Sequence, residues 1–330
     1  MSVFYEYKGL IPQNIAPKGA KKIIINHNGK IINNIALGKL SRTTDNKLYS
    51  YGVISDTHVM NNGGNTSPYS SLKLDNALTW FENQGCLFVT HTGDITNHGF
   101  WNSDETKDLT QFAEYKRVCE KHSIPIYTIC GNHDSYFKPI TDNVGDLLTY
   151  TNNDVYYSIT EGNDMFIFLG QPSANIPMSD EAFSWLKNIF LSNKEKRFFV
   201  HVHCYLDSGN AHNSYGNNFF ATWNKTSEFK KLLSEYKTVL FHGHSHINFI
   251  HQETDKTANY TNNGFHSVHV PSLIGYRQIA EDEPNVESLG YLVDVYSDYI
   301  VLNGRDFGTY SSSKMINPKY VPIATYRINI

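Results

Sequence analysis

The hydrophobic and polar positions along the chain follow two periods, one typical of strands and the other typical of helices. Short apolar runs that finish in glycine or polar residues predict strands, at residues 48–55, 86–93, 126–131, 197–205 and 238–246. Segments in which apolar residues recur every three or four positions predict helices, at residues 70–85, 104–125, 179–192 and 226–237. Most of these helices fall between strands, so the pattern favours an α/β fold.

Two of the predicted helices indicate which side chains belong to the core. The first has one apolar face, which is formed by Leu74, Ala77, Leu78 and Phe81. In the second we expect Phe112, Ala113 and Cys119 to face inward. A glycine after the first helix and a proline after the second mark where the helices end.

Both ends of the chain are rich in strand signals. Residues 1–48 contain two Ile-rich segments separated by Asn-His-Asn-Gly-Lys, a hairpin signal, and are interpreted as a small β-rich N-terminal extension. Residues 154–170 predict a second hairpin. We place the main core at residues 49–275, and a C-terminal group of strands that completes or covers it at residues 276–330. The simplest architecture is a two-sheet β-sandwich flanked by helices, in four layers.

Composition and charge narrow the function only slightly. The chain has 330 residues, of which 40% are hydrophobic, so it can bury a substantial core. Its net charge of −4 gives no broad basic field, so nucleic acid is an unlikely partner. No window approaches the roughly 20 apolar residues of a membrane span, and no secretory signal is visible. Together with four cysteines that form no Cys-x-x-Cys pair, this leads us to expect a cytoplasmic protein without a membrane partner.

Five predicted strands end in acidic, amide or imidazole side chains. These are Asp56 with His58, Asp94, Asn132 with His133, His201 with His203, and His244 with His246. The carboxyl ends of strands in an open α/β sheet are where sites form, so we expect these groups to converge. Oxygen and imidazole ligands without thiolate suit Mn, Fe, Zn or Ni. There are too many ligands for one ion, whereas two ions that share a carboxylate would use them all.

The five blocks resemble the pattern of the calcineurin-like metallophosphoesterases, which is D-x-H, G-D, G-N-H-D/E, a lone His and G-H-x-H. They occur in that order between residues 56 and 246, across most of the chain. The resemblance implies a metallophosphoesterase-like fold that binds two divalent or trivalent ions, with Asp94 as the bridge. It implies one metal held by Asp56, His58, Asp94 and His246. It implies a second metal held by Asp94, Asn132, the lone His and His244.

The same resemblance implies a reaction and roles for single residues. A hydroxide that bridges the two metals would attack the phosphorus of a phosphoester. His133 and Asp94 are the expected catalytic residues, because His133 would contact the phosphate or protonate the leaving group. Asn132, His133 and His98 are the candidates for contact with a small-molecule substrate.

The lone His of the pattern has two candidates. The family often shows His, any residue and then Pro after the strand, and the segment His-Val-His-Cys fits if His203 takes the proline position. Strand periodicity places both imidazoles on the same face of the sheet. We therefore favour His201 as the ligand and keep His203 as the alternative.

Departures from the family pattern indicate a subtype. Protein phosphatases of this superfamily carry Asp and Arg where this chain has Asn97 and His98, so the arginine that clamps a phosphate is missing. The stretch is more similar to the phosphodiesterase-type bacterial and phage branch. Two other hypotheses stay open: a weakly catalytic or non-catalytic module that docks in a phage or cell-surface assembly, and a nuclease. The terminal β segments are the candidates for contact with an assembly partner or a second copy.

The remaining histidines are expected to have other roles. Structural or surface roles are expected for His91, His242, His251, His266 and His269. A loop rich in Gly and Asn follows the lone His, and Asn210 and His212 within it are further candidates for facing the substrate.

Overall fold

The protein is described here by a computed structural model that divides into two units, Met1–Lys47 and Leu48–Ile330. The described residues are 3–6, 23–27, 30–32, 46–59, 68–97, 105–134, 156–171, 176–204, 206, 219–246, 249, 260–262, 264–274, 288–308, 310–311, 314–315 and 319–330.

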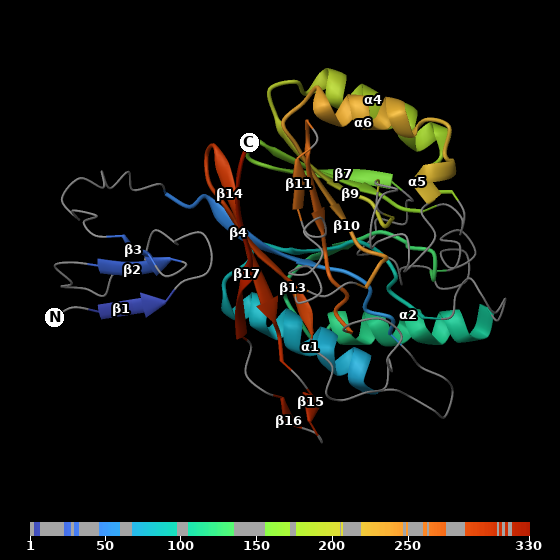
Figure 1. The fold of residues 1–330 in the computed structure, drawn as a ribbon. Coiled ribbons are helices and arrows are strands. Elements are labelled where there is room, and N and C mark those ends of the chain that lie inside the picture. Colours follow the sequence, from blue (N-terminus) through green and yellow to red (C-terminus); the bar gives the residue numbers. More distant parts are fainter. Residues whose placement is uncertain are drawn as a thin grey trace. The chain divides into compact units, whose positions relative to one another are not determined.

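The first unit contains a three-stranded sheet (Figure 1). Its strands are β1 (Val3–Glu6), β2 (Ile23–His27) and β3 (Lys30–Ile32). Strands β1 and β2 are parallel, whereas β2 and β3 are antiparallel with His27 opposite Lys30. This short-range antiparallel pair is the hairpin that the Asn-Gly signal predicts.

The second unit is built on two six-stranded sheets. The β4 sheet has the order β17 (Lys319–Asn329), β14 (Tyr299–Asp306), β13 (Leu289–Val295), β4 (Tyr49–Ile54), β5 (Val89–His91), β6 (Ile126–Thr128). The β9 sheet has the order β11 (Tyr260–Asn262), β12 (His266–His269), β10 (Thr238–His242), β9 (Arg197–His201), β8 (Asp164–Leu169), β7 (Tyr156–Glu161). A small pair of strands is formed by β15 (Tyr310–Ser311) and β16 (Lys314–Met315).

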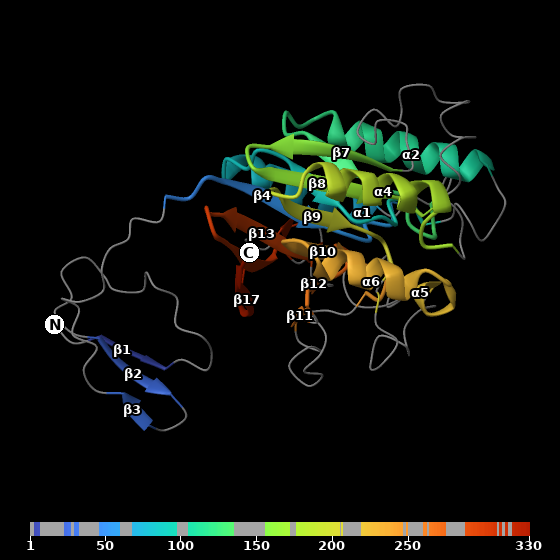
Figure 2. The ribbon, with the colours of Figure 1, turned by 90° about the horizontal axis from the view of Figure 1, so that it is seen from above.

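Helices cover the outer faces of both sheets. Helices α1 (Pro68–Asn83) and α2 (Glu105–Cys119) pack against the β4 sheet. Helices α4 (Asp180–Ser192) and α6 (Thr226–Ser234), with the short α5 (Phe219–Thr222), pack against the β9 sheet. Figures 1 and 2 show the resulting order of helices, sheet, sheet, helices. The predicted sandwich with flanking helices is therefore confirmed.

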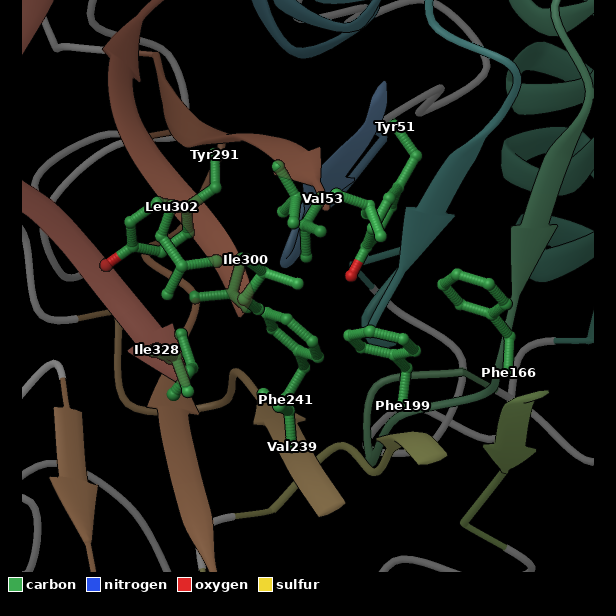
Figure 3. Close-up of a cluster of buried hydrophobic side chains, with 14 of the residues drawn as sticks. Tyr51, Val53, Phe166, Phe199, Val239, Phe241, Tyr291, Ile300, Leu302 and Ile328 are labelled. Atoms are coloured by element: carbon green, nitrogen blue, oxygen red, sulfur yellow. The ribbon is translucent and has the colours of Figure 1, made fainter. Parts of the chain in front are cut away.

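The space between the two sheets is filled by the side chains of alternating strand residues. Tyr51 and Val53 of β4 point toward Phe166 of β8 and Phe199 of β9, as Figure 3 shows. Ile54 belongs to the opposite face and packs beneath α1. All of these side chains are fully buried, so the two sheets are held rigidly against each other.

The predicted helix faces agree with the structure except at one position. The four apolar residues predicted for α1 are all fully buried. In α2, Phe112 and Cys119 are buried as predicted, but Ala113 is exposed. Tyr115 and Val118 are buried instead, at the three-residue spacing from Phe112 that one helix face requires. None of the helices among the described residues is long and apolar enough to cross a membrane.

The topology brings the carboxyl ends of several strands to one edge of the sandwich. Strands β4, β5 and β6 run parallel, and so do β8, β9, β10 and β12. Strand β13 pairs antiparallel with β4, with Tyr291 opposite Val53. The last strand, β17, belongs to the same sheet, so both ends of the second unit share one sheet. The segments that follow the parallel strands carry the polar blocks of the sequence.

Candidate metal centre

Two overlapping groups of side chains could each hold a metal ion. The first consists of Asp56, His58, Asp94 and His246, and the second of Asp94, His203 and His244. Within each group the ligand atoms lie within 4.8 Å of one another. Asp94 is the member common to both, so a single carboxylate stands between the two candidate positions.

The first group joins turns from both sheets. The Nε2 atoms of His58 and His246 are 2.9 Å apart. The His246 Nε2 atom lies 3.2 Å from Asp56 Oδ1, and the His58 Nε2 atom lies 3.6 Å from Asp94 Oδ2. All of these residues are at least nine-tenths buried except His246, which is slightly more exposed. Two imidazole nitrogens and two carboxylates that face one another form a donor set suited to a first-row transition metal.

The second group is oriented by a backbone carbonyl. His203 Nδ1 lies 2.9 Å from the Thr92 carbonyl oxygen and must donate to it, because a carbonyl can only accept. In the neutral imidazole this leaves the lone pair on Nε2, which lies 3.2 Å from Asp94 Oδ2 and 2.9 Å from Asn132 Oδ1. Metal-binding histidines are commonly held by such a carbonyl, so these residues fit a metal ion.

The structure corrects the preference for His201. This residue is the last of β9, and its ring is stacked at 4.7 Å on Phe168 and at 5.3 Å on Phe241 in the core between the sheets. Its Nδ1 atom lies 3.2 Å from the Ile167 carbonyl oxygen. The strand ends there, so its two-residue period does not extend to His203, which reaches the site from the following segment.

Five of the candidate ligands have a strained backbone. Asp56, His58, Asp94, His244 and His246 have φ angles between 40° and 73°. No other non-glycine residue in the described ranges has a positive φ. Such a conformation costs on the order of 1–3 kcal/mol per residue, and it persists only where surrounding contacts enforce it. The strain is therefore concentrated where the candidate ligands leave their strands.

The two carboxylates are held by neighbouring hydrogen-bond donors. Asp56 accepts from the Ser55 hydroxyl and, at 3.1 Å, from the His244 backbone N–H. Asp94 accepts from the backbone N–H of His133 at 2.9 Å. The two backbone bonds each tie one polar block to another, so the position of each carboxylate depends on more than one part of the chain.

Electrostatics also favours charged carboxylates in the site. Burial alone would raise the pKa of Asp94, but the nearby His203 and His133 outweigh it and hold that pKa well below its usual range. Burial alone would lower the pKa of His203, but Asp94 raises it to about 9. Burial lowers the pKa of His244 to about 4. A buried anion of this kind requires a positive partner, either a proton on His203 or a bound cation.

His133 lies at the border of the site. Its ring contacts the His58 ring edge-on at 4.8 Å, and it is partly exposed. Its Nδ1 atom donates to the Asn97 carbonyl oxygen at 2.9 Å. This bond fixes the direction of the imidazole relative to Asp94, whose carboxylate accepts from the His133 backbone.

Asp134 is a site residue to which sequence reasoning assigned no role. It is buried, and its carboxylate accepts from the backbone N–H groups of Ile95, Thr96 and Gly131 at 3.1, 2.8 and 2.8 Å. It therefore fastens the Asp94 segment to the Asn132 turn. The signal was present as the last letter of Gly-Asn-His-Asp, but two of the three partners of Asp134, Ile95 and Thr96, lie 39 and 38 residues away in the sequence.

The other predicted residues fall into two groups. His98, Asn210, His212 and His251 lie outside the described residues. His91, His242 and His269 are buried and His266 is partly buried, at or near the ends of strands.

Gly131 allows a close approach between two blocks. A Cβ atom at this position would lie 2.2 Å from Asp94 Oδ1 and 2.5 Å from the Asp94 backbone nitrogen. We expect Gly131→Ala to displace Asp94 and to weaken Mn²⁺ binding by at least about tenfold, the size seen when the support of a metal ligand is removed. Calorimetric titration of the metal-stripped protein measures this effect.

Gly85→Ala is the matched control for that substitution. Gly85 has a φ of 69°, but a Cβ there would meet no atom within 4 Å. We expect this control to lower stability by roughly 1 kcal/mol and to leave Mn²⁺ affinity unchanged. Unaltered Mn²⁺ affinity in Gly131→Ala would show that Asp94 tolerates the added methyl group.

Comparisons with known proteins agree with the fold. The model of the calcineurin-like phosphoesterase family matches residues 49–248. A dimetal phosphatase from Danio rerio is similar at 12% identity and a TM-score of 0.58, over 83% of this chain and 99% of that one. GAP50, the anchor in the inner membrane complex of Plasmodium, is similar at 13% identity and a TM-score of 0.51, over 86% of this chain and 89% of that one. A search of curated proteins found no match. The matched segment spans more than half of the chain and contains all of the candidate ligands, and the protein therefore belongs to the calcineurin-like phosphoesterase family.

Proposed function

We propose that the protein is a binuclear metal-dependent phosphodiesterase that acts on a small phosphoester. The observation that carries this proposal is that Asp94 belongs to both candidate ligand groups. A carboxylate shared by two groups is what a pair of adjacent ions requires, and a single structural ion would not need it. Membership of the phosphoesterase family supports the reaction class.

The residues present indicate which ion each would hold. Asp56, His58, Asp94 and His246 would hold one ion, and Asp94, Asn132, His203 and His244 the other. Bound Mn, Fe, Zn or Ni ions would supply Lewis-acid stabilisation of phosphoryl oxygens and activation of a water molecule. The imidazole and oxygen donors do not select among these metals.

The protein itself contributes a group that can move a proton. The Nδ1–H group of His133 is engaged by the Asn97 carbonyl, so Nε2 is the atom at which His133 can hold or release a proton. A doubly protonated His133 could give that proton to a departing alkoxide, which general acid catalysis requires. Its partial exposure at the border of the site is compatible with contact to a substrate.

Charge supports a diester over a monoester. The contacts described above for the two ligand groups involve carboxylate, imidazole, amide, hydroxyl and backbone groups, and none of these contacts involves a lysine or an arginine. A monoester carries up to two negative charges and is commonly held by an arginine clamp, whereas a diester carries one. Asn97 stands where protein phosphatases of this superfamily carry Asp. Its backbone N–H donates to the Gln111 side chain at 2.9 Å, and its carbonyl accepts from His133.

The proposal is tested by restoring metal to metal-stripped protein. We expect hydrolysis of bis-p-nitrophenyl phosphate to return on addition of Mn²⁺ and to exceed hydrolysis of p-nitrophenyl phosphate. Release of p-nitrophenolate measures both rates under the same conditions. Full activity without metal would refute the metal-dependent mechanism, and a preference for the monoester would refute the diesterase assignment.

Metal analysis and assays on other substrates separate the alternatives. GAP50 is named as an anchor, so a related role as a docking module is the second candidate for this chain. Two bound ions without turnover of any phosphoester would favour that role. Cleavage of single-stranded or double-stranded nucleic acid at low salt would favour a nuclease, which the net charge of −4 does not support.

A further inference from the structure

Two turns of the candidate metal centre share one design. Thr57 lies between the ligands Asp56 and His58, three residues after β4 ends. Ser245 lies between His244 and His246, three residues after β10 ends. In both turns the flanking ligands have a positive φ and the central residue is a buried hydroxyl. Thr57 and Ser245 belong to neither candidate ligand group. Their hydroxyls are therefore available for a role other than metal binding.

The Thr57 hydroxyl is held by a buried imidazole of the neighbouring strand. The His91 Nδ1 atom accepts from the Gly93 backbone N–H at 3.1 Å, so in the neutral ring Nε2 carries the proton. That Nε2 atom lies 3.1 Å from the Thr57 hydroxyl oxygen, which in turn donates to the Ile95 carbonyl at 3.0 Å. Gly93 and Ile95 flank Asp94. His91 therefore links the centre of one ligand turn to both sides of the shared carboxylate.

The Ser245 hydroxyl has the equivalent partner in the other sheet. The His269 Nε2 atom lies 2.7 Å from the Ser245 oxygen, and both residues are buried. His269 is the last residue of β12 and pairs with His242, the last residue of β10. In the same way His91 is the last residue of β5 and pairs with Ile54, the last residue of β4. The same contact thus occurs once in each sheet, at the same position relative to the ligand strand.

We propose that His91 and His269 are positioning residues of the metal centre. Each holds the hydroxyl at the middle of a ligand–hydroxyl–ligand turn and so keeps two strained ligands at the spacing that one pair of ions requires. Neither imidazole belongs to either candidate ligand group among the described residues. The inference rests on the proposed function, because the geometry it preserves matters only if ions bind.

Isosteric removal of the hydroxyl gives the sharpest test. We expect Thr57→Val and Ser245→Ala to weaken Mn²⁺ binding to metal-stripped protein by about ten- to a hundredfold. The conservative variants Thr57→Ser and Ser245→Thr keep the hydroxyl and should bind Mn²⁺ within about threefold of wild type. The single variants Thr57→Val and His91→Phe are also compared with the double variant that carries both changes. We expect the double variant to bind Mn²⁺ no more weakly than whichever single variant binds it more weakly, because the two residues act as one unit. Calorimetric titration gives each affinity.

Thr90→Val is the matched control within the same sheet. Thr90 is buried on β5, and its hydroxyl donates to the Gly52 carbonyl at 3.4 Å, away from the ligand turns. Its Mn²⁺ affinity should equal that of wild type, and an equal loss in this control and in Thr57→Val would overturn the proposal. Affinities of Thr57→Val and Ser245→Ala within twofold of wild type would also overturn it, even if His91→Phe fails to fold. Absence of Mn²⁺ binding by the wild-type protein would instead refute the proposed function.

Discussion

Replacement of Asp94 by asparagine is expected to remove both metal ions and nearly all hydrolysis. The substitution keeps the size of the side chain and the oxygen that accepts from the His133 backbone at 2.9 Å, so the turn should persist. It removes the charge shared by the two ligand groups. Metal ions supply several kcal/mol of transition-state stabilisation, and about 4 kcal/mol corresponds to a thousandfold rate. We therefore expect kcat/KM for bis-p-nitrophenyl phosphate to fall by about a thousandfold or more.

Metal analysis and a second variant complete this experiment. Elemental analysis should show about two ions per wild-type chain, as two ligand groups predict, and fewer than one in Asp94→Asn. Asp294→Asn is the control, because Asp294 is a partly buried carboxylate of β13 bonded to Ser50 and Asn303 near the start of β4. It should retain metal and activity. If Asp94→Asn kept both ions, the shared-ligand arrangement would be wrong.

The second large effect distinguishes the two histidines of one short segment. His203→Ala should lose about one metal equivalent and reduce kcat/KM by about a hundredfold or more, because the ligand facing Asp94 and Asn132 is removed. His201→Leu should keep both ions and activity within about threefold. Its imidazole lies between Phe168 and Phe241, and a leucine of similar volume suits that environment. The opposite outcome would restore His201 as the ligand.

The pH dependence of stability gives an independent check on His201. Burial lowers the pKa of this imidazole to about 3, below the value of about 6.5 expected in the unfolded chain. Between these values the unfolded state binds the proton and the folded state does not, so stability falls as pH decreases from about 6.5 toward 3. Relative to His201→Leu, the metal-stripped wild type should lose about 1.4 kcal/mol per pH unit in this window. Urea unfolding at several pH values measures the difference, and parallel curves would contradict the buried neutral imidazole.

Much of the site could be predicted because its ligands directly follow apolar strands. A run such as the one before Asp56 indicates a buried strand, and parallel strands bring their carboxyl ends to one edge. The blocks containing Asp94, Asn132 and His244 follow the same logic, and the structure brings these blocks together. Within each sheet the strand order was not needed for that inference, because every parallel order places the carboxyl ends at one edge. That the edges of the two sheets coincide is seen only in the structure.

What could not be predicted depends on where the backbone changes direction and on partners distant in sequence. The choice between His201 and His203 depends on where β9 ends, and one residue of strand length reverses it. The bond between His91 and Thr57 joins residues 34 positions apart through neighbouring strands, and local pattern carries no sign of it. The prediction placed Ala113 on the buried face of α2, but it is exposed. A single small apolar residue fits either face of a helix, so the pattern does not decide its position.

The pairing of β4 with β13 has a consequence for the order in which the protein can fold. Five residues of β13, Tyr291–Val295, pair with one side of β4, yet about 240 residues separate the two strands in the chain. During synthesis this edge of β4 has no native partner until the ribosome has also released β13. Such distant pairing slows folding and leaves a strand edge open in the meantime, so we expect aggregation to compete with folding at this edge of β4.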